Sequence, residues 1–125
     1  GYRFQTTRQG RLTRWPRKRS LDKLKDSLRA KTRRNEGRSL RCIVEDVQGT
    51  LRGWFVYFKH SCRATFAPLD KWIRGRLRSI LRRRAGRRGR GRGADHQRWP
   101  NAYFAERGYR SLVTAHDAER QSPCG

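Results

Sequence analysis

Apolar residues recur at helical spacing over residues 39–58, the most hydrophobic stretch of the chain. The steps between them are 3, 1, 3, 4, 3, 1 and 3, so they form one continuous stripe. Ser39 stands where a helix N-cap belongs. Gly49 interrupts the stripe and predicts a kink or short break, whereas Gly53 predicts close approach of a neighbouring backbone beside Trp54. The stripe consists of Leu40, Ile43, Val44, Val47, Leu51, Trp54, Phe55 and Phe58.

Two further helices flank this stretch. Leu21, Leu24 and Leu28 predict a basic amphipathic helix over residues 21–34, with Ser20 as its N-cap and Asp22 in its first turn. A third helix is expected to begin near Phe66, because Pro68 is tolerated only in a first helical turn. Its apolar side carries Leu69, Trp72, Ile73, Leu77, Ile80 and Leu81.

The ends of the chain carry shorter elements. Alternating residues and the turn at Gln9-Gly10 predict a β-hairpin over residues 2–15, which Pro16 ends. Short helices are expected over residues 102–108 and 111–120. The predicted fold class is therefore mainly α: a three-helix bundle preceded by a hairpin and followed by short helices. Its expected core comprises Leu24, Leu28, Ile43, Val47, Leu51, Trp54, Phe55, Phe58, Leu69, Trp72, Ile73 and Leu77, with the stretch around Trp54 at its centre.

Charge defines the class of partner. The 125 residues include 33 Lys and Arg against 10 Asp and Glu, for a net charge of +23. Self-repulsion of this size favours an anionic partner, and nucleic acid is the first expectation. An amphipathic membrane-active polypeptide is a weaker alternative. No apolar run approaches the roughly 20 residues of a spanning helix, and no signal peptide is evident.

The cysteines and the missing methionine bear on cellular context. Cys42, Cys62 and Cys124 are an odd, widely spaced set without a CxxC pair, which favours a reducing, cytoplasmic setting over a disulfide framework. Because the sequence lacks methionine, Gly1 is not expected to be a natural translation start, and the chain is expected to be a fragment or a trimmed product.

Candidate chemical groups are sparse. Glu45 and Asp46 are adjacent on a helix and project about 100° apart, without an evident third metal ligand. His60 and Cys62 do not have the spacing of a structural zinc module, even with His96 or His116 added. We therefore expect no metal, no cofactor and no catalytic residue in this chain. Asp70 is expected to pair with an arginine across the bundle.

Arginine dominates two segments. Arg74, Arg78 and Arg82 recur every fourth residue along the third helix and are joined by Arg76, Arg83 and Arg84. Residues 82–93 (RRRAGRRGRGRG) are of low complexity and are expected to be disordered in isolation. Planar guanidinium groups bind phosphate oxygens in a bidentate manner, so this composition favours contact with a structured nucleic-acid backbone.

Three stretches together resemble the C-terminal region of bacterial group II intron reverse transcriptases, called the thumb, domain X or maturase-specific domain. LRGWFVYF at residues 51–58 looks like the family signature LRGW-x-x-YF. FAPLDKWIRGRLR at 66–78 is similar to its F-x-x-LD-x-W-[IV]-R-x-RLR helix. RWPNAYFAERG at 98–108, followed by Ser111-Leu112, looks like the closing segment. Val56 and Gly49 depart from the Asn and Pro that the family often has.

The resemblance implies a thumb-like bundle that binds the parent intron RNA to promote splicing and grips the template–primer duplex during reverse transcription. The start of the chain looks like the end of the final palm strand. Polymerase carboxylates and their Mg²⁺ would belong to an upstream palm and fingers, so the chain is expected to be a non-catalytic part of an RNA-directed DNA polymerase. The alternative is a free-standing basic RNA-binding or RNA-chaperone protein.

The resemblance also implies a layout and a set of contacts. The expected segments are a palm end and hairpin (1–19), the thumb (20–84), a basic linker (85–97) and a helical extension (98–125). RNA contact is carried over to Arg52, Arg74, Arg76 and Arg78, which lie in the matched motifs, and Tyr57 can present its hydroxyl to RNA. Charge alone adds Lys23, Arg33, Arg34, Arg82, Arg83, Arg84, Arg87, Arg88, Arg90 and Arg92.

Overall fold

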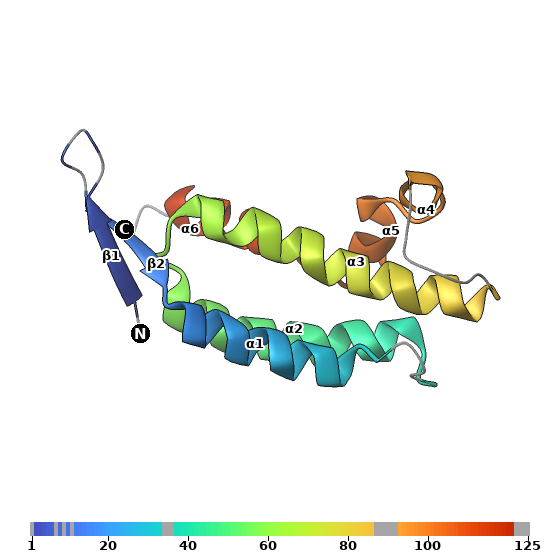
Figure 1. Cartoon of the computed structure of the whole chain (residues 1–125). Helices are drawn as coiled ribbons and strands as arrows, with labels where there is room; N and C mark the ends of the chain where they lie inside the picture. Colours follow the sequence, from blue (N-terminus) through green and yellow to red (C-terminus); the bar gives the residue numbers. More distant parts are fainter. Residues whose placement is uncertain are drawn as a thin grey trace.

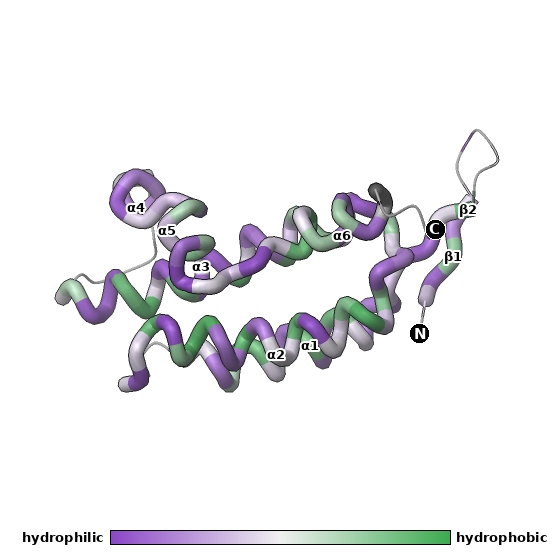
Figure 2. Tube along the Cα trace, turned by 180° about the vertical axis from the view of Figure 1, so that it is seen from behind, coloured by the Kyte–Doolittle hydropathy of each residue, from purple (hydrophilic) through white to green (hydrophobic). Residues whose placement is uncertain are grey.

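The computed structural model describes residues 2–6, 8, 10, 12–33, 37–86 and 93–121, the side chains of 93, 94, 120 and 121 excepted. A two-stranded hairpin lies at one end of a long helical body (Figure 1). In that body α1 lies beside α2, and α3 lies beside α6 (Figures 1 and 2). The fold is mainly α with an N-terminal hairpin, as the sequence predicts.

The hairpin consists of β1 (Tyr2–Thr6) and β2 (Leu12–Pro16), paired antiparallel from Tyr2 opposite Pro16 to Thr6 opposite Leu12. Its connection includes Gly10, whose φ of 78° favours glycine. Two long-range hydrogen bonds tie the ribbon to the helices. The Tyr2 hydroxyl donates to the Tyr57 carbonyl at 2.9 Å, and the Cys62 amide donates to the Arg14 carbonyl at 2.8 Å.

Helix α1 spans Lys18–Lys31, which begins before the predicted range. The predicted Ser20 cap is wrong: the N-cap is Arg17 in extended conformation, and Ser20 already lies inside the first turn. The helix starts as soon as Pro16 has ended the strand. The amide of Leu21 donates to the Arg17 carbonyl at 3.1 Å. Leu24 and Leu28 are the buried residues of this helix, as expected from their spacing.

Helix α2 spans Leu40–Phe58, and Ser39 caps it as predicted by accepting a hydrogen bond from the Cys42 amide at 3.2 Å. The predicted break near Gly49 is wrong, because the helix runs through it. Burial of the apolar stripe outweighs the cost of about 1 kcal/mol of one helical glycine. The close approach predicted at Gly53 is also wrong: a Cβ built there meets no atom within 4 Å.

Helix α3 spans Phe66–Arg84 and begins where the sequence predicts, with Pro68 in its first turn. The short 3₁₀ helix η1 (Arg63–Thr65) precedes it. Residues 82–84, the start of the segment predicted to be disordered, complete α3. Residues 87–92 of that segment lie outside the described part of the chain.

The C-terminal segment contains α4 (Gly93–Arg98), α5 (Asn101–Glu106) and α6 (Leu112–Gln121). Helix α4 lies mostly within residues 85–97, where a linker was expected. Trp99, Phe104, Tyr109 and Leu112 are buried in the same core as α1–α3. The region after residue 98 therefore takes part in the packing of the bundle.

Figure 2 shows hydrophobic and hydrophilic residues alternating along α1, α2 and α3, in keeping with their amphipathic sequences. Nine of the predicted core residues are buried: Leu24, Leu28, Ile43, Val47, Leu51, Phe58, Leu69, Ile73 and Leu77. Trp54, Phe55 and Trp72 are only partly buried against that core. The predicted centre around Trp54 is therefore wrong. The largest fully buried side chains are Phe66 and Phe104, and Phe66 receives the rings of Trp54 and Phe55 edge-on.

Candidate nucleic-acid interface

The arginines of the matched motifs fall into two groups. In the first group the guanidinium is turned into the bundle and contacts other parts of the chain. In the second group it faces solvent or an open hollow and makes no hydrogen bond or ion pair within the described residues. This division decides which cations are available to an anionic partner.

Arg78 belongs to the interior group, with only 3% of its surface exposed. Its Nε donates to the Trp99 carbonyl at 2.9 Å and its Nη2 donates to the Asn101 Oδ1 at 2.9 Å. The guanidinium also lies 5.2 Å from the centre of the Phe104 ring. Burial lowers the pKa of Arg78 from its ordinary value. We correct the predicted RNA contact of Arg78: this side chain holds the C-terminal segment against α3.

Arg76 closes the end of α1. Its Nε donates to the Thr32 Oγ1 at 2.7 Å and its Nη2 to the Thr32 carbonyl at 3.2 Å. The Thr32 hydroxyl donates in turn to the Leu28 carbonyl at 2.6 Å. Carbonyls at the end of a helix lack partners within it. These bonds therefore supply donors to carbonyl oxygens at the end of α1 and attach this helix to α3. Arg76 therefore has a structural role, and its predicted RNA contact stays a prediction.

Arg82 and Arg84 also contact other described residues. Arg82 forms an ion pair with the buried Asp95 at 2.9 Å, which fixes α4 beside α3. Arg84 donates to the Arg38 carbonyl, which joins the end of α3 to the segment before α2. Because Arg82 is itself 15% exposed in its side chain, it presents little free surface to a ligand.

The outward group includes Lys23 on α1, Arg33 after it, Arg52 on α2 and Arg83 on α3, all exposed. Arg74 is half-buried and lines a hollow beside Tyr109. None of these five side chains is involved in a hydrogen bond or ion pair within the described part of the chain. Arg34, Arg87, Arg88, Arg90 and Arg92 lie outside the described residues, and their RNA contacts stay predictions.

A third group of cations surrounds the half-buried Trp72. Lys25, Arg29 and Arg76 lie 5.5, 5.4 and 5.5 Å from the centre of its indole. Cations over an aromatic face are attracted by the ring quadrupole. Trp72 thereby holds positive charge together on the α1–α3 side of the bundle.

Acidic residues are largely matched to cations on the surface. Arg38 contacts Asp46, Arg63 contacts Asp117 at 3.0 Å, and Arg29 contacts Asp26 at 2.8 Å. These surface carboxylates therefore form ordinary ion pairs with neighbouring arginines. The three carboxylates neutralise some basic residues but leave the outward group unpaired.

Asp70 has the structural role that was predicted but not the predicted partner. It is 1% exposed, and its carboxylate accepts from the Tyr109 hydroxyl at 2.6 Å and the Ser111 hydroxyl at 2.8 Å. The amides of Leu112 and Val113 donate to it as well, at 2.9 and 3.1 Å. A buried carboxylate needs such donors. The predicted pairing with an arginine is wrong, because the C-terminal segment supplies all of these partners.

Other chemistry is limited in the described residues. Among them, no group of three or more His, Cys, Asp and Glu side chains is arranged to hold a metal ion. Cys42 and Cys62 are free thiols. Within the same residues, no helix combines the length and hydropathy of a membrane span.

The structure thus defines a basic helical bundle whose interior arginines fix its helices and whose outer arginines and lysines face solvent. The family model for the group II intron, maturase-specific domain matches residues 21–99. This match covers more than half of the chain, and the chain belongs to that family. It runs from α1 through α3 to Trp99, so it includes both groups of arginines. A search of curated proteins finds no match.

Proposed function

We propose that this maturase-specific domain binds group II intron RNA through its outward cations and promotes splicing by stabilising the active RNA fold. The observation that carries the proposal is the division of the arginines. Arg76 and Arg78 donate hydrogen bonds that hold the helices together. Arg52 and the other outward cations have no ion-pair partner among the described residues.

The hydrogen bonds of the interior arginines hold the helices in place and thereby fix the positions from which the outer cations can bind RNA. A guanidinium on a rigid helix is already placed to meet a phosphate, so less freedom is lost on binding than on a flexible chain. The net charge of +23 adds long-range attraction for a polyanion. The domain would thus act by positioning RNA, without a general acid or base of its own.

The resemblance extends the proposal to DNA synthesis. In a longer polypeptide, the same bundle would grip a template–primer duplex beside a reverse-transcriptase palm. The palm would supply carboxylates and Mg²⁺, and the present residues would supply backbone contacts. The hairpin Tyr2–Pro16 attached to α2 supports this proposal, because an antiparallel ribbon can extend a neighbouring sheet.

Affinity for intron RNA tests the proposal. The 125-residue chain is mixed with a labelled group II intron transcript and, separately, with a shuffled transcript of equal length at about 150 mM salt, where phosphate contacts are partly screened. Tighter binding of the intron supports a maturase role, and addition of the chain should accelerate self-splicing of that transcript. Equal binding of both transcripts would instead favour a general RNA-binding or RNA-chaperone protein.

A further inference from the structure

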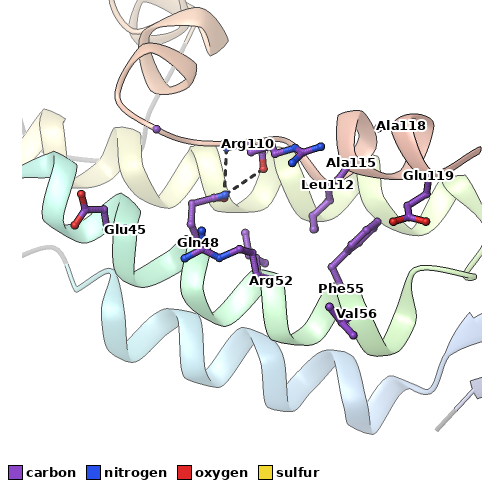
Figure 3. A pocket seen from close by; sticks show the side chains of 12 residues that line it. Glu45, Gln48, Arg52, Phe55, Val56, Arg110, Leu112, Ala115, Ala118 and Glu119 are labelled. Carbon is purple, nitrogen blue, oxygen red and sulfur yellow. Dashed lines mark hydrogen bonds between the residues drawn. The ribbon is translucent and has the colours of Figure 1, made fainter. Parts of the chain in front are cut away.

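A groove of about 760 Å³ lies between α2 and α6. Figure 3 shows its lining, with Arg52 and Phe55 on α2 and Leu112, Ala115 and Ala118 on α6. The volume falls within the usual range of about 300–1,000 Å³ for small-ligand sites. The groove is therefore large enough for a single nucleotide.

The floor of the groove is apolar and fixed. Leu51 and Leu112 are 2% and 3% exposed, so the floor is continuous with the core. The Phe55 side chain extends from α2 toward α6 (Figure 3). Its ring packs edge-on against Phe66 with centroids 5.7 Å apart, which restricts its rotation. A half-exposed aromatic ring held in this way can stack on a nucleobase.

The middle of the rim is cationic. On one side of the groove lies Arg52, which is exposed and has no hydrogen-bond or ion-pair partner among the described residues. Arg110 lies on the other side, where the Gln48 side chain binds both its backbone amide and its carbonyl at 3.3 Å. These bonds fix the backbone from which the second guanidinium projects. The two cations match the charge of a nucleotide's phosphate, and the apolar floor matches its base.

Carboxylates limit what else fits. Glu45 and Glu119 lie toward opposite ends of the groove (Figure 3), and Glu119 is 3.8 Å from the Lys59 Nζ. A phosphodiester strand running along the groove would meet a carboxylate at each end, which repels it. A single nucleotide that enters the groove from the solvent side would place its phosphate only at the middle of the rim, between the two arginines.

We propose that this groove receives one unpaired nucleotide of a bound RNA, with its base against Phe55 and its phosphate between Arg52 and Arg110. The inference rests on the proposed RNA-binding function and adds a site that reads an unstacked base. Proteins recognise RNA sequence and shape mainly through such unpaired nucleotides.

The test compares two short RNA hairpins, one fully paired and one with a single bulged adenosine. Stacking of one base changes the affinity by roughly 5- to 150-fold, so the bulged hairpin should bind tighter by a factor in this range. Ala118→Trp fills the groove without changing its charge. It should remove the preference for the bulge and leave the affinity for the paired hairpin unchanged. Ala30→Trp, at an exposed alanine of α1, is the matched control and should retain the preference.

Three results would overturn the inference. They are the absence of a bulge preference in the unmodified chain, a preference that survives Ala118→Trp, and a dimer in sedimentation that Ala118→Trp converts to monomer. The last result would make the groove a contact between two copies of the chain. If the unmodified chain binds neither hairpin, the result would instead contradict the proposed RNA-binding function itself.

Photo-crosslinking gives a readout that needs no variant. A bulged 4-thiouridine in the hairpin should crosslink to groove residues such as Phe55, as located by mass spectrometry of the digested chain. Crosslinks confined to other surfaces would contradict the proposed site.

Discussion

The Asp70 carboxylate and the Tyr109 hydroxyl are joined by a hydrogen bond of 2.6 Å inside the bundle. The two residues lie 39 positions apart, one on α3 and the other between α5 and α6. Since Asp70 also accepts from Ser111, Leu112 and Val113, one carboxylate fixes the chain that leads into α6. The groove between α2 and α6 depends on that placement.

Replacing Asp70 with Asn should destabilise the fold by about 1–3 kcal/mol, since an amide NH₂ would face backbone donors that now have a carboxylate acceptor. Urea unfolding followed by circular dichroism measures the loss. Asp22→Asn, at an exposed carboxylate of α1, is the control and should change stability by less than about 0.5 kcal/mol. Equal stability of the two variants would refute a central role for Asp70.

Stability should fall at high pH through Tyr109. Burial, followed by the charge and hydrogen bond of Asp70, raises the pKa of Tyr109 above its ordinary value of 10.0. The folded state therefore keeps this proton at a pH where the unfolded chain loses it. The stabilising contribution is complete below pH 10.0 and decreases as the pH rises above it. Urea titrations above and below that pH should show a steeper decline for the unmodified chain than for Tyr109→Phe, and parallel declines would contradict this assignment.

Arg78 and Arg52 should separate stability from RNA binding. Arg78→Met removes hydrogen bonds to Trp99 and Asn101 and should cost at least about 1.5 kcal/mol, as for bonds to charged groups. Arg52→Ala should change stability by less than about 0.5 kcal/mol yet weaken RNA binding. Filter binding at a temperature where both variants are folded makes the comparison. A larger RNA-binding defect in Arg78→Met than in Arg52→Ala would show that their roles are reversed.

The core should respond more to Phe66 than to Trp54. Phe66 is fully buried, so Phe66→Ala should cost about 3–5 kcal/mol. Trp54 is only partly buried, and Trp54→Ala should cost less. Thermal unfolding of both variants ranks them, and a greater loss for Trp54→Ala would place the centre of the core back at α2.

Much of the fold is predictable from local patterns. The Leu24 and Leu28 spacing identifies the buried side of α1, and Ser39 identifies the start of α2, because both signals act over a few residues. The break expected at Gly49 does not form, because the local cost of one helical glycine is small beside the burial of Val47 and Leu51, which only the assembled bundle reveals.

The site was harder to predict because motif membership does not show which way an arginine points. Arg74, Arg76 and Arg78 lie within five residues of one helix, yet Arg78 is interior, Arg76 is clamped to Thr32 and Arg74 is half-buried. The sequence does hold a partial signal. Arg78 lies four residues after Arg74, in the cationic repeat, but it is also adjacent to the apolar position Leu77 and so lies near the apolar stripe of the helix. The partners Trp99 and Asn101 are more than 20 residues away, beyond the reach of helical periodicity.

The salt dependence of intron RNA binding tests the central claim most directly. If the outward cations contact six to ten phosphates, affinity should fall by roughly 10³–10⁵ between about 50 and 200 mM salt. Arg52→Ala should reduce the slope of log affinity against log salt by about one phosphate contact, while Arg78→Met leaves it unchanged. An affinity that is independent of salt, or a slope that Arg52→Ala does not alter and Arg78→Met does, would contradict the account.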